Sequence, residues 1–405
     1  MTAWRPAFPR RARPAVGVIC VAYALFVAML GTTLPTPLYP IYQQRLGFGS
    51  LLTTIVFSVY AGGVIIALLL FGCASDLLGR RPVLLAGLAV SGLSAGGYLA
   101  VGGLPVLLVA RLLSGLAAGL VTATATVALV EMVSPRRQTA AALLAAAVNM
   151  FGLGCGPLLA GLLAEFASHP LRLPFLVDLV LVAAAMAGVL LAPETVHARR
   201  TAWPRPRRPS VAAPARAVFV PVAIAVFAAF AVFGLLGAIE PGILATVLHL
   251  PDRALAGGIV FAMFAASAVA QVGLARVPPR LALPIGCVVL IAGLAAIAGA
   301  LLEGSLALLF GGTIVVGVGQ SLSFRAGVAA ITAISPAPQR AGTVSSLFVV
   351  AYAGVAIPVV LVGAAVAPLG LRNAAIAFTG AVAVLSAAAL VTVLRLEHPQ
   401  GRQVG

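Results

Sequence analysis

The stretch GCASDLLGRRP, residues 72–82, places an acid and two arginines directly after a long apolar run. Only 8% of the 405 residues are charged, whereas 62% are hydrophobic and the mean hydropathy is +1.16. A soluble fold could not bury that much apolar surface, so we expect the chain to lie in a lipid bilayer. The apolar runs continue for about 20 residues without period-two alternation, which predicts spanning helices and excludes a transmembrane barrel.

The chain contains twelve such runs, six on each side of a Pro- and Arg-rich stretch. They cover roughly residues 15–38, 50–72, 82–103, 105–131, 139–163, 172–193, 217–243, 254–275, 281–302, 305–332, 341–368 and 371–394. This predicts an all-α integral membrane fold of twelve transmembrane helices in two pseudo-symmetric six-helix halves. The predicted parts are an N-terminal tail (1–14), an N-terminal half (15–195), a linker (196–216), a C-terminal half (217–394) and a C-terminal tail (395–405).

The net charge of +16 would suggest nucleic-acid binding in a soluble protein. Where the charges lie along the chain decides between nucleic-acid binding and a role in membrane topology. All 25 basic residues are arginines, and 19 of them fall in the tails, the linker and the loops of one side. The loops of the other side hold four, and Arg111 and Arg325 lie within predicted spans. This asymmetry predicts that both termini and the linker are cytoplasmic and argues against nucleic-acid binding.

Several other classes of protein are disfavoured. The first apolar run is longer than a signal-peptide core and lacks a convincing cleavage site, so we expect a retained first helix. The chain has no lysine and hence no Walker-type motif, and its histidines fall in loops or tails. We therefore expect no enzyme, no cofactor and no metal site. The four cysteines lie in or beside separate spans and give no disulfide framework: Cys20, Cys73, Cys155 and Cys287.

Weak internal repeats occur in the same order in both halves. SPRRQTA (134–140) and SPAPQRA (335–341) align at an offset of 201, which also aligns Pro157 with Pro358. GTTLP (31–35) and GAIEP (237–241) each lie late in the first helix of a half. Two parallel halves with a substrate path between them explain these matches most simply.

The opening stretch lies in the predicted short cytoplasmic loop between the second and third helices. With Gly72, Asp76, Gly79, Arg80 and Arg81 it resembles the signature loop of the major facilitator superfamily. The resemblance covers the whole chain and implies a secondary transporter whose halves rock around a midplane site. It also implies that the acid engages a cytoplasmic helix end of the other half and nearby arginines, as a latch that holds the inside closed. The family's pattern often has a basic residue where this chain has Leu77. The alternative to the latch is that the two arginines only set the orientation of the chain in the membrane.

Two further motifs carry the resemblance. RLLSG (111–115) resembles the arginine motif of the fourth helix, which is linked with proton coupling in efflux members of the family. The alternative for Arg111 is a structural hydrogen bond to backbone carbonyls of a neighbouring helix. GLGCGPLLAG (152–161) looks like the fifth-helix motif of the family's antiporters and favours export over uptake. Ordinary Gly-Pro helix packing is the alternative for its residues, Gly152, Gly156, Pro157 and Gly161.

Glu240, which precedes Pro241 in the seventh helix, has only apolar neighbours. We hypothesise that it carries a proton through the transport cycle, and solvation at the external interface is the alternative. Arg325 in the tenth helix is open to three interpretations: substrate contact, a counter-ion for an acid, or a group that reaches the cytoplasmic interface. Asp178 is expected to be interfacial.

The resemblance implies that helices 1, 4, 7 and 10 line the central cavity. The candidate cavity residues are Thr33, Thr126, Asn149, Gln320 and Arg325. The cavity is otherwise thinly polar, which suits hydrophobic or amphipathic compounds better than sugars or phosphates. The expected function is proton-coupled efflux of such compounds. The alternatives are proton symport or facilitated uptake of a small organic solute, and a non-transporting membrane sensor. The absence of lysine and the abundance of alanine suggest a bacterial cytoplasmic membrane, and a monomer suffices for the mechanism.

Overall fold

The computed structural model describes residues 14–72, 74–196 and 210–397. The predictions made for the N-terminal tail, for Cys73, for most of the linker and for the end of the C-terminal tail concern residues outside these ranges.

Every element among the described residues is a helix, and eleven helical segments are long and apolar enough to cross a membrane. This agrees with the predicted all-α membrane class. The elements are α1 (Pro14–Thr33), η1 (Thr36–Leu38), α2 (Tyr39–Leu46), α3 (Ser50–Phe71), α4 (Ala74–Leu78), α5 (Arg80–Leu99), α6 (Leu104–Glu131), η2 (Pro135–Arg137), α7 (Gln138–Phe166), α8 (Leu173–Leu191), η3 (Ala213–Ala215), α9 (Arg216–Thr246), α10 (Arg253–Gly273), α11 (Pro279–Glu303), α12 (Leu306–Ile334) and α13 (Ala337–Glu397).

The first apolar run does not form one helix over 15–38 as the sequence predicts. Helix α1 ends at Thr33, and a 3-10 turn and the short α2 follow it. Pro35 and Pro37 lack the N–H that an α-helix needs and disfavour helical backbone in the residue before them, so the helix breaks here. Helix α2 in turn ends at Gly47, whose φ of 68° is the left-handed conformation that glycine adopts readily.

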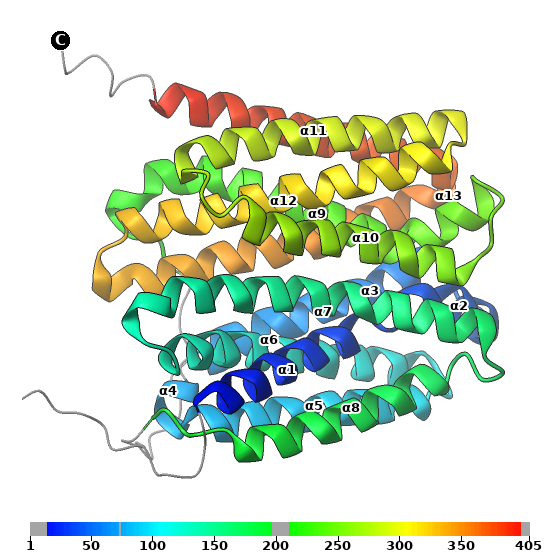
Figure 1. The fold of residues 1–405 in the computed structure, drawn as a ribbon. Coiled ribbons are helices and arrows are strands. Elements are labelled where there is room, and N and C mark those ends of the chain that lie inside the picture. The colour runs from blue at the N-terminus through cyan, green and yellow to red at the C-terminus, as the bar shows by residue number, and fades with distance from the viewer. Residues whose placement is uncertain (1–13, 73, 197–209, 398–405) are drawn as a thin grey trace, which may run out of the picture.

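Helix α13 runs for 61 residues and is interrupted at Gly370, which has a φ of 77° and is not helical. The predicted spans 341–368 and 371–394 fall on either side of this glycine. In Figure 1 the orange first part of α13 and its red last part run in opposite directions. The chain therefore reverses at Gly370 and returns to the end of the bundle from which α13 began.

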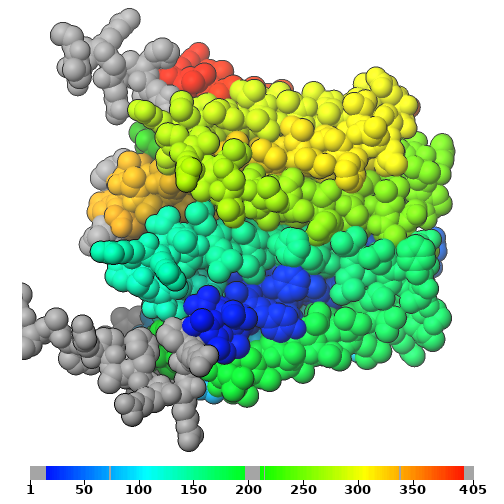
Figure 2. Space-filling view, in the orientation of Figure 1, coloured from blue at the N-terminus to red at the C-terminus, as the bar shows by residue number. Residues whose placement is uncertain are grey.

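The helices pack as two groups. Helices α1 to α8, which we call the N-terminal group, pack mainly on one another, and so do α9 to α13, the C-terminal group. The groups meet chiefly where α7 lies against α10 and α3 against α13. Figure 2 shows the first of these contacts, with the teal α7 alongside the yellow-green α10.

Burial distinguishes the centre of the bundle from its outer surface. Helix α9 has 83% of its most apolar window buried, against 33% for α8. Large apolar side chains are exposed on the outer helices, for example Ile19, Phe166, Val269 and Val384. Such a belt of exposed apolar side chains is expected of helices that face lipid. The chain is a multi-pass membrane protein.

The two ends of the bundle are distinguished by their loops. We call one the Arg80 end, because it carries α4 and the start of α5, and the other the Arg253 end, because it carries the start of α10 (Figure 1). Helix α10 begins after Asp252, whose Oδ1 accepts a hydrogen bond of 2.8 Å from the Leu255 N–H. This cap satisfies one of the free donors of the first helical turn.

Candidate functional site

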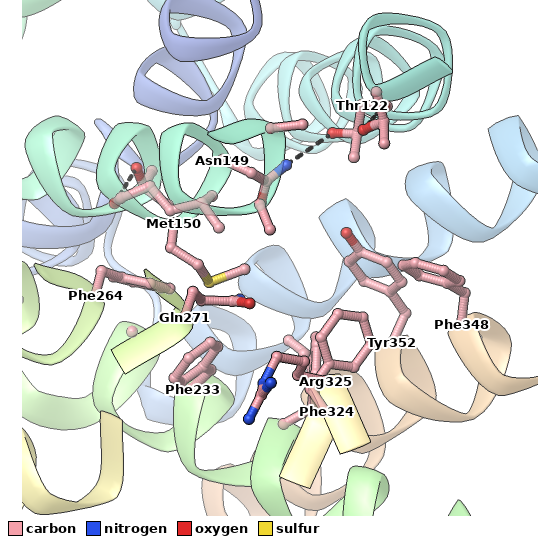
Figure 3. A pocket seen from close by; sticks show the side chains of 18 of the residues that line it. Thr122, Asn149, Met150, Phe233, Phe264, Gln271, Phe324, Arg325, Phe348 and Tyr352 are labelled. Carbon is pink, nitrogen blue, oxygen red and sulfur yellow. Dashed lines mark hydrogen bonds between the residues drawn. The ribbon is translucent and has the colours of Figure 1, made fainter. Parts of the chain in front are cut away.

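A cavity of about 390 Å³ lies between the two groups and is lined by side chains of both. This volume is within the range of sites for drug-sized molecules, roughly 300–1,000 Å³. Most of the lining is apolar (Figure 3). Eight aromatic side chains contribute: Phe57, Tyr60, Phe230, Phe233, Phe264, Phe324, Phe348 and Tyr352.

The cavity lies toward the Arg80 end. Thr139 and Ala142, in the first turns of α7, line it and are exposed, so the cavity reaches the surface there. Val328, near the end of α12, and Phe348, near the start of α13, line the same part.

At the Arg253 end the two groups are in contact. The Arg253 N–H donates to Glu165 Oε2 at 3.1 Å, and its Nη1 lies 3.6 Å from the same oxygen. Nearer the middle, Ser58 Oγ donates to the Ala356 carbonyl at 3.1 Å. Gly237 of α9 packs against the ring of Phe57. The cavity is thus open at one end of the bundle and closed at the other.

Four of the five predicted cavity residues line the cavity: Thr33, Thr126, Asn149 and Arg325. The threonine hydroxyls are already engaged with backbone, because Thr33 donates to the Leu153 carbonyl at 2.8 Å and Thr126 to the Thr122 carbonyl at 2.7 Å. Asn149 Nδ2 donates to Thr122 Oγ1 at 3.2 Å, the dashed line in Figure 3.

Gln320, the fifth candidate, does not line the cavity. It is fully buried, and its Oε1 accepts a hydrogen bond of 2.8 Å from Ser267 Oγ of α10. A polar residue on α12 was expected to face the path, but this side chain lies on the face that packs on α10. Gln271 takes its place in the lining, and its Nε2 has no partner (Figure 3).

Arg111 is 1% exposed and lies among aromatic rings. Its guanidinium carbon is 5.0 Å from the ring centre of Tyr60, 5.2 Å from that of Phe57 and 6.0 Å from that of Tyr39. Its Nη1 donates to the Thr32 carbonyl at 2.6 Å, and its Nε has no hydrogen-bond partner in the part of the chain that the structure describes. Cation–π contacts of this kind stabilise a charge in a dry site. The hydrogen bond that the structural alternative predicts is therefore present, and the side chain also borders the cavity.

Arg325 holds the end of α10. Its Nη1 donates to the Ala275 carbonyl at 2.8 Å, and its Nη2 to the Leu274 carbonyl at 2.7 Å. A cation at a helix C-terminus satisfies free carbonyls and interacts favourably with the helix dipole. None of these partners is an acid, so the counter-ion interpretation finds no support among the described residues.

Two acids are buried inside the bundle. Glu240 is 0% exposed, and neither carboxylate oxygen has a hydrogen-bond partner among the described residues. This burial excludes the alternative of a solvated interfacial acid. Asp178 is 2% exposed and lies in the second turn of α8, near the Arg253 end, so it is buried against other helices; its interfacial depth stays a prediction. It packs on α1 at Gly31, where only the absence of a side chain leaves room for its carboxylate.

The loop between α3 and α5, around residues 72–82, contains a short helix, α4. Its charged side chains form a network within the N-terminal group. Arg80 is buried and its Nη1 donates to Asp76 Oδ1 and to Ser75 Oγ, both at 2.6 Å. Its Nη2 and Nε donate to Glu131 at 2.8 and 3.2 Å. The described contacts of Asp76 are therefore with its own group, and its side chain is 51% exposed.

Glu194, which sequence reasoning missed, caps the start of α5. Its Oε1 accepts from the Arg80 N–H at 2.9 Å and its Oε2 from the Arg81 N–H at 3.1 Å. A carboxylate at a helix N-terminus is stabilised by the free N–H groups and by the helix dipole. Gly79 has a φ of 103°, and any side chain there would meet Glu194, which explains the glycine of the motif.

The glycines of α7 mark close helix contacts. A methyl group on Gly152 would lie 2.7 Å from the Phe26 carbonyl of α1, and one on Gly156 would fall on the Leu30 carbonyl. Gly161 instead faces the Arg253 carbonyl of α10, in the other group. Helix α7 therefore contacts α1 and α10 through a stripe of small residues, and Pro157 lies within it.

Sequence reasoning missed most of the aromatic lining, because an aromatic residue in an apolar span gives no sign of the direction it faces. One such pair is Tyr60 and Tyr352, from opposite groups, whose ring centres are 6.2 Å apart. Among the described residues, no cluster of three or more His, Cys, Asp or Glu side chains could hold a metal ion.

Comparison with solved structures shows the same fold at low sequence identity. The human organic anion transporter MFSD10 (TETRAN) is 18% identical, with 95% of this chain and 100% of that chain covered and a TM-score of 0.69. A POT family transporter in complex with 5-aminolevulinic acid is 15% identical, with 96% and 98% covered and a TM-score of 0.76. A bacterial homolog of the human lysosomal transporter Spinster, in an inward-facing and unoccupied conformation, is 15% identical, with 94% and 98% covered and a TM-score of 0.64.

A search of curated protein sequences finds no match to this chain. The sequence pattern of the Major Facilitator Superfamily matches residues 21–302, which is more than half of the chain. Together with the fold, this match shows that the chain belongs to the Major Facilitator Superfamily.

Proposed function

We propose that the protein is a secondary active transporter that exports small hydrophobic or amphipathic compounds in exchange for protons, by alternating access. The observation that carries this proposal is the cavity between the two groups, open at the Arg80 end and closed at the Arg253 end. A cavity with one open end is what one state of an alternating-access cycle requires.

The proposed architecture is twelve membrane crossings in two six-helix halves, residues 15–195 and 217–394, joined by the linker 196–216. A straight helix of 61 residues would be about 90 Å long, three times the thickness of the hydrocarbon core. The reversal at Gly370 supports two crossings by α13, which raises the eleven apolar helical segments to twelve.

The orientation rests on the arginines. The loops of the Arg80 end, the linker and the two tails together carry 19 of the 25, so the positive-inside rule supports a cytoplasmic Arg80 end and cytoplasmic termini. The state described is then open to the cytoplasm. Composition supports a bacterial cytoplasmic membrane, and one chain with its own cavity supports a functional monomer.

Proton coupling is proposed for Glu240 and Arg111. Glu240 is buried without a partner at the closed end, so a carboxyl group there is costly to ionise unless the site opens. Opening of the Arg253 end would expose it to protons on the outside. Arg111 borders the cavity and contacts the ring of Tyr60, so a movement of that ring during transport would change the surroundings of the guanidinium.

The latch role of Gly72, Asp76, Gly79, Arg80 and Arg81 belongs to the opposite state, in which the Arg80 end is closed. Support comes from the exposure of the Asp76 side chain, which leaves carboxylate surface for a partner from the other group. The small-residue stripe of α7, on which Gly161 faces α10, supports a rocking contact between the groups.

Proton movement in inside-out vesicles tests the proposal. The lumen is acidified, and drug-like compounds and sugars are added in turn while lumenal pH is followed. We expect alkalinisation with amphipathic compounds, its loss in Asp76→Asn and its weakening in Glu240→Gln. Glu303→Gln, at an exposed acid at the end of α11, is the control. If no compound moves protons, antiport is wrong and uptake of a small organic solute replaces it.

A further inference from the structure

We propose that the cavity selects amphipathic organic anions, compounds with an apolar body and one carboxylate or sulfonate group, and that it excludes lipophilic cations. This inference rests on the proposed function, because it specifies the substrate class of the same cavity. It starts from the charges of the lining, which are all of one sign.

Among the described residues, two arginines and no acidic side chain line the cavity. Arg111 bonds to the carbonyl of Thr32, and Arg325 bonds to carbonyls at the end of α10. Within residues 14–72, 74–196 and 210–397, neither guanidinium has a carboxylate partner. The buried acids Glu240 and Asp178 lie outside the lining.

The hydrogen bonds of Arg325 do not cancel its charge. A helix C-terminus carries the equivalent of about half a negative charge, whereas the guanidinium carries a full positive one. The rings around Arg111 are neutral. The cavity therefore has a net positive field, and in a poorly solvated site such a field acts strongly on a charged ligand.

The two arginines lie at different depths. Both α6 and α12 begin at the Arg253 end, with Arg111 seven residues and Arg325 nineteen residues beyond the first helical residue. At a rise of ~1.5 Å per residue, the two positions are about 18 Å apart along the bundle axis. Arg325 thus lies toward the open end of the cavity and Arg111 toward its closed end.

The lining between these charges suits the rest of an amphipathic anion. The rings of Phe233, Phe264 and Phe324 offer apolar contact for a hydrocarbon body. Gln271 is 3% exposed and its Nε2 has no hydrogen-bond partner within the described ranges, so a donor is available for a ligand oxygen. A cation would meet two like charges without a counter-ion, which in such an environment opposes binding.

Binding of three naphthalene compounds to the purified protein in nanodiscs tests the inference. The probes are 2-naphthoate, neutral 2-naphthylmethanol and the cation 2-naphthylmethyl-trimethylammonium, which share one apolar body. We expect the anion to bind at least tenfold more tightly than the neutral compound, as two unit charges within ~12 Å allow, and the cation to bind least. Equal affinities, or a preference for the cation, would overturn the inference.

Two pairs of variants at lining positions guard against the possibility that one substitution impairs folding. Asn149→Asp adds a carboxylate to the lining and is expected to lower anion affinity about tenfold and to raise that of the cation. Asn149→Leu, uncharged and with the same number of side-chain heavy atoms, is its matched control and should leave the order of the three probes unchanged. Arg325→Gln should weaken anion binding more than Arg325→Lys, which keeps the charge.

The outcomes separate the inference from the proposed function. Preferential anion binding without any substrate-driven proton movement supports the anion site and contradicts proton antiport. Proton movement driven by all three probes alike supports export and overturns anion selection. Loss of anion preference in Asn149→Asp but not in Asn149→Leu confirms that the charge of the lining is the cause.

Discussion

Arg80 and Glu131 form a two-bond ion pair, Nη2 to Oε1 at 2.8 Å and Nε to Oε2 at 3.2 Å, that joins the start of α5 to the end of α6. The same carboxylate accepts a hydrogen bond of 2.6 Å from Thr195 Oγ1, directly before the linker. One acid therefore connects two helices and the chain that leaves the N-terminal group.

Replacing Glu131 with Gln should destabilise the fold. Hydrogen bonds to a charged partner contribute about 1.5–3 kcal/mol, and the buried Arg80 would lose a paired carboxylate. We expect a lower midpoint of thermal unfolding in detergent. Glu303→Gln, at an exposed position, should leave the midpoint unchanged. Equal midpoints for the two variants would contradict a structural role for the pair.

Replacing Gly156 with Ala should disrupt the contact of α7 with α1. The added methyl group would fall on the Leu30 carbonyl and on Thr33 Oγ1, and overpacking of this kind costs about 1–3 kcal/mol. Gly62 of α3 is the matched control, because a methyl group there has no neighbour within 4 Å. Gly62→Ala should be neutral or stabilising by up to about 1 kcal/mol. The measurement is the midpoint of thermal unfolding of both variants. An unchanged midpoint for Gly156→Ala would contradict the close contact between α7 and α1.

Variants of Glu240 should affect the stability of the fold and proton coupling in opposite directions. Because its carboxyl group is fully buried and unpartnered, Glu240→Leu is expected to raise the unfolding midpoint while it abolishes substrate-driven proton movement. Glu240→Gln should keep the shape and also lose proton movement. A variant that is less stable than the parent would indicate that the carboxyl group has a partner in the membrane.

A disulfide across the closed end should stop transport. A Cβ atom on Gly363 of α13 would lie 2.9 Å from Thr54 Cβ of α3. The Cβ atoms of bridged cysteines are roughly 3.5–4.5 Å apart, so a small outward shift of the two helices would accommodate the bond. We expect Thr54→Cys with Gly363→Cys, in a chain whose four native cysteines are replaced, to lose transport on oxidation and regain it on reduction. Each single cysteine variant is a control. Undiminished transport by the oxidised protein would exclude separation of α3 from α13 in the cycle.

The sequence predicts the membrane class and the apolar segments, because composition and run length report directly on a lipid environment. It does not predict the break after Thr33, since a proline can also be accommodated inside a membrane helix, as Pro157 is. It places Gln320 in the cavity and does not predict that Asp178 is buried against other helices, because the periodicity of an all-apolar helix does not say which face is buried. The role of Glu194 as a cap depends on a contact across more than 100 residues, which no local pattern encodes.

The contacts on either side of the linker also set a mechanical limit. Glu194 fixes the chain to α5 of the N-terminal group, and Val196 N–H donates to Glu194 Oε1 at 3.1 Å. On the other side, Ala212 N–H donates to Thr343 Oγ1 of the C-terminal group at 3.3 Å. Between these two attachment points, sixteen residues of chain can reach at most about 55 Å. These two attachment points therefore cannot move farther apart than this reach in any conformation of the protein.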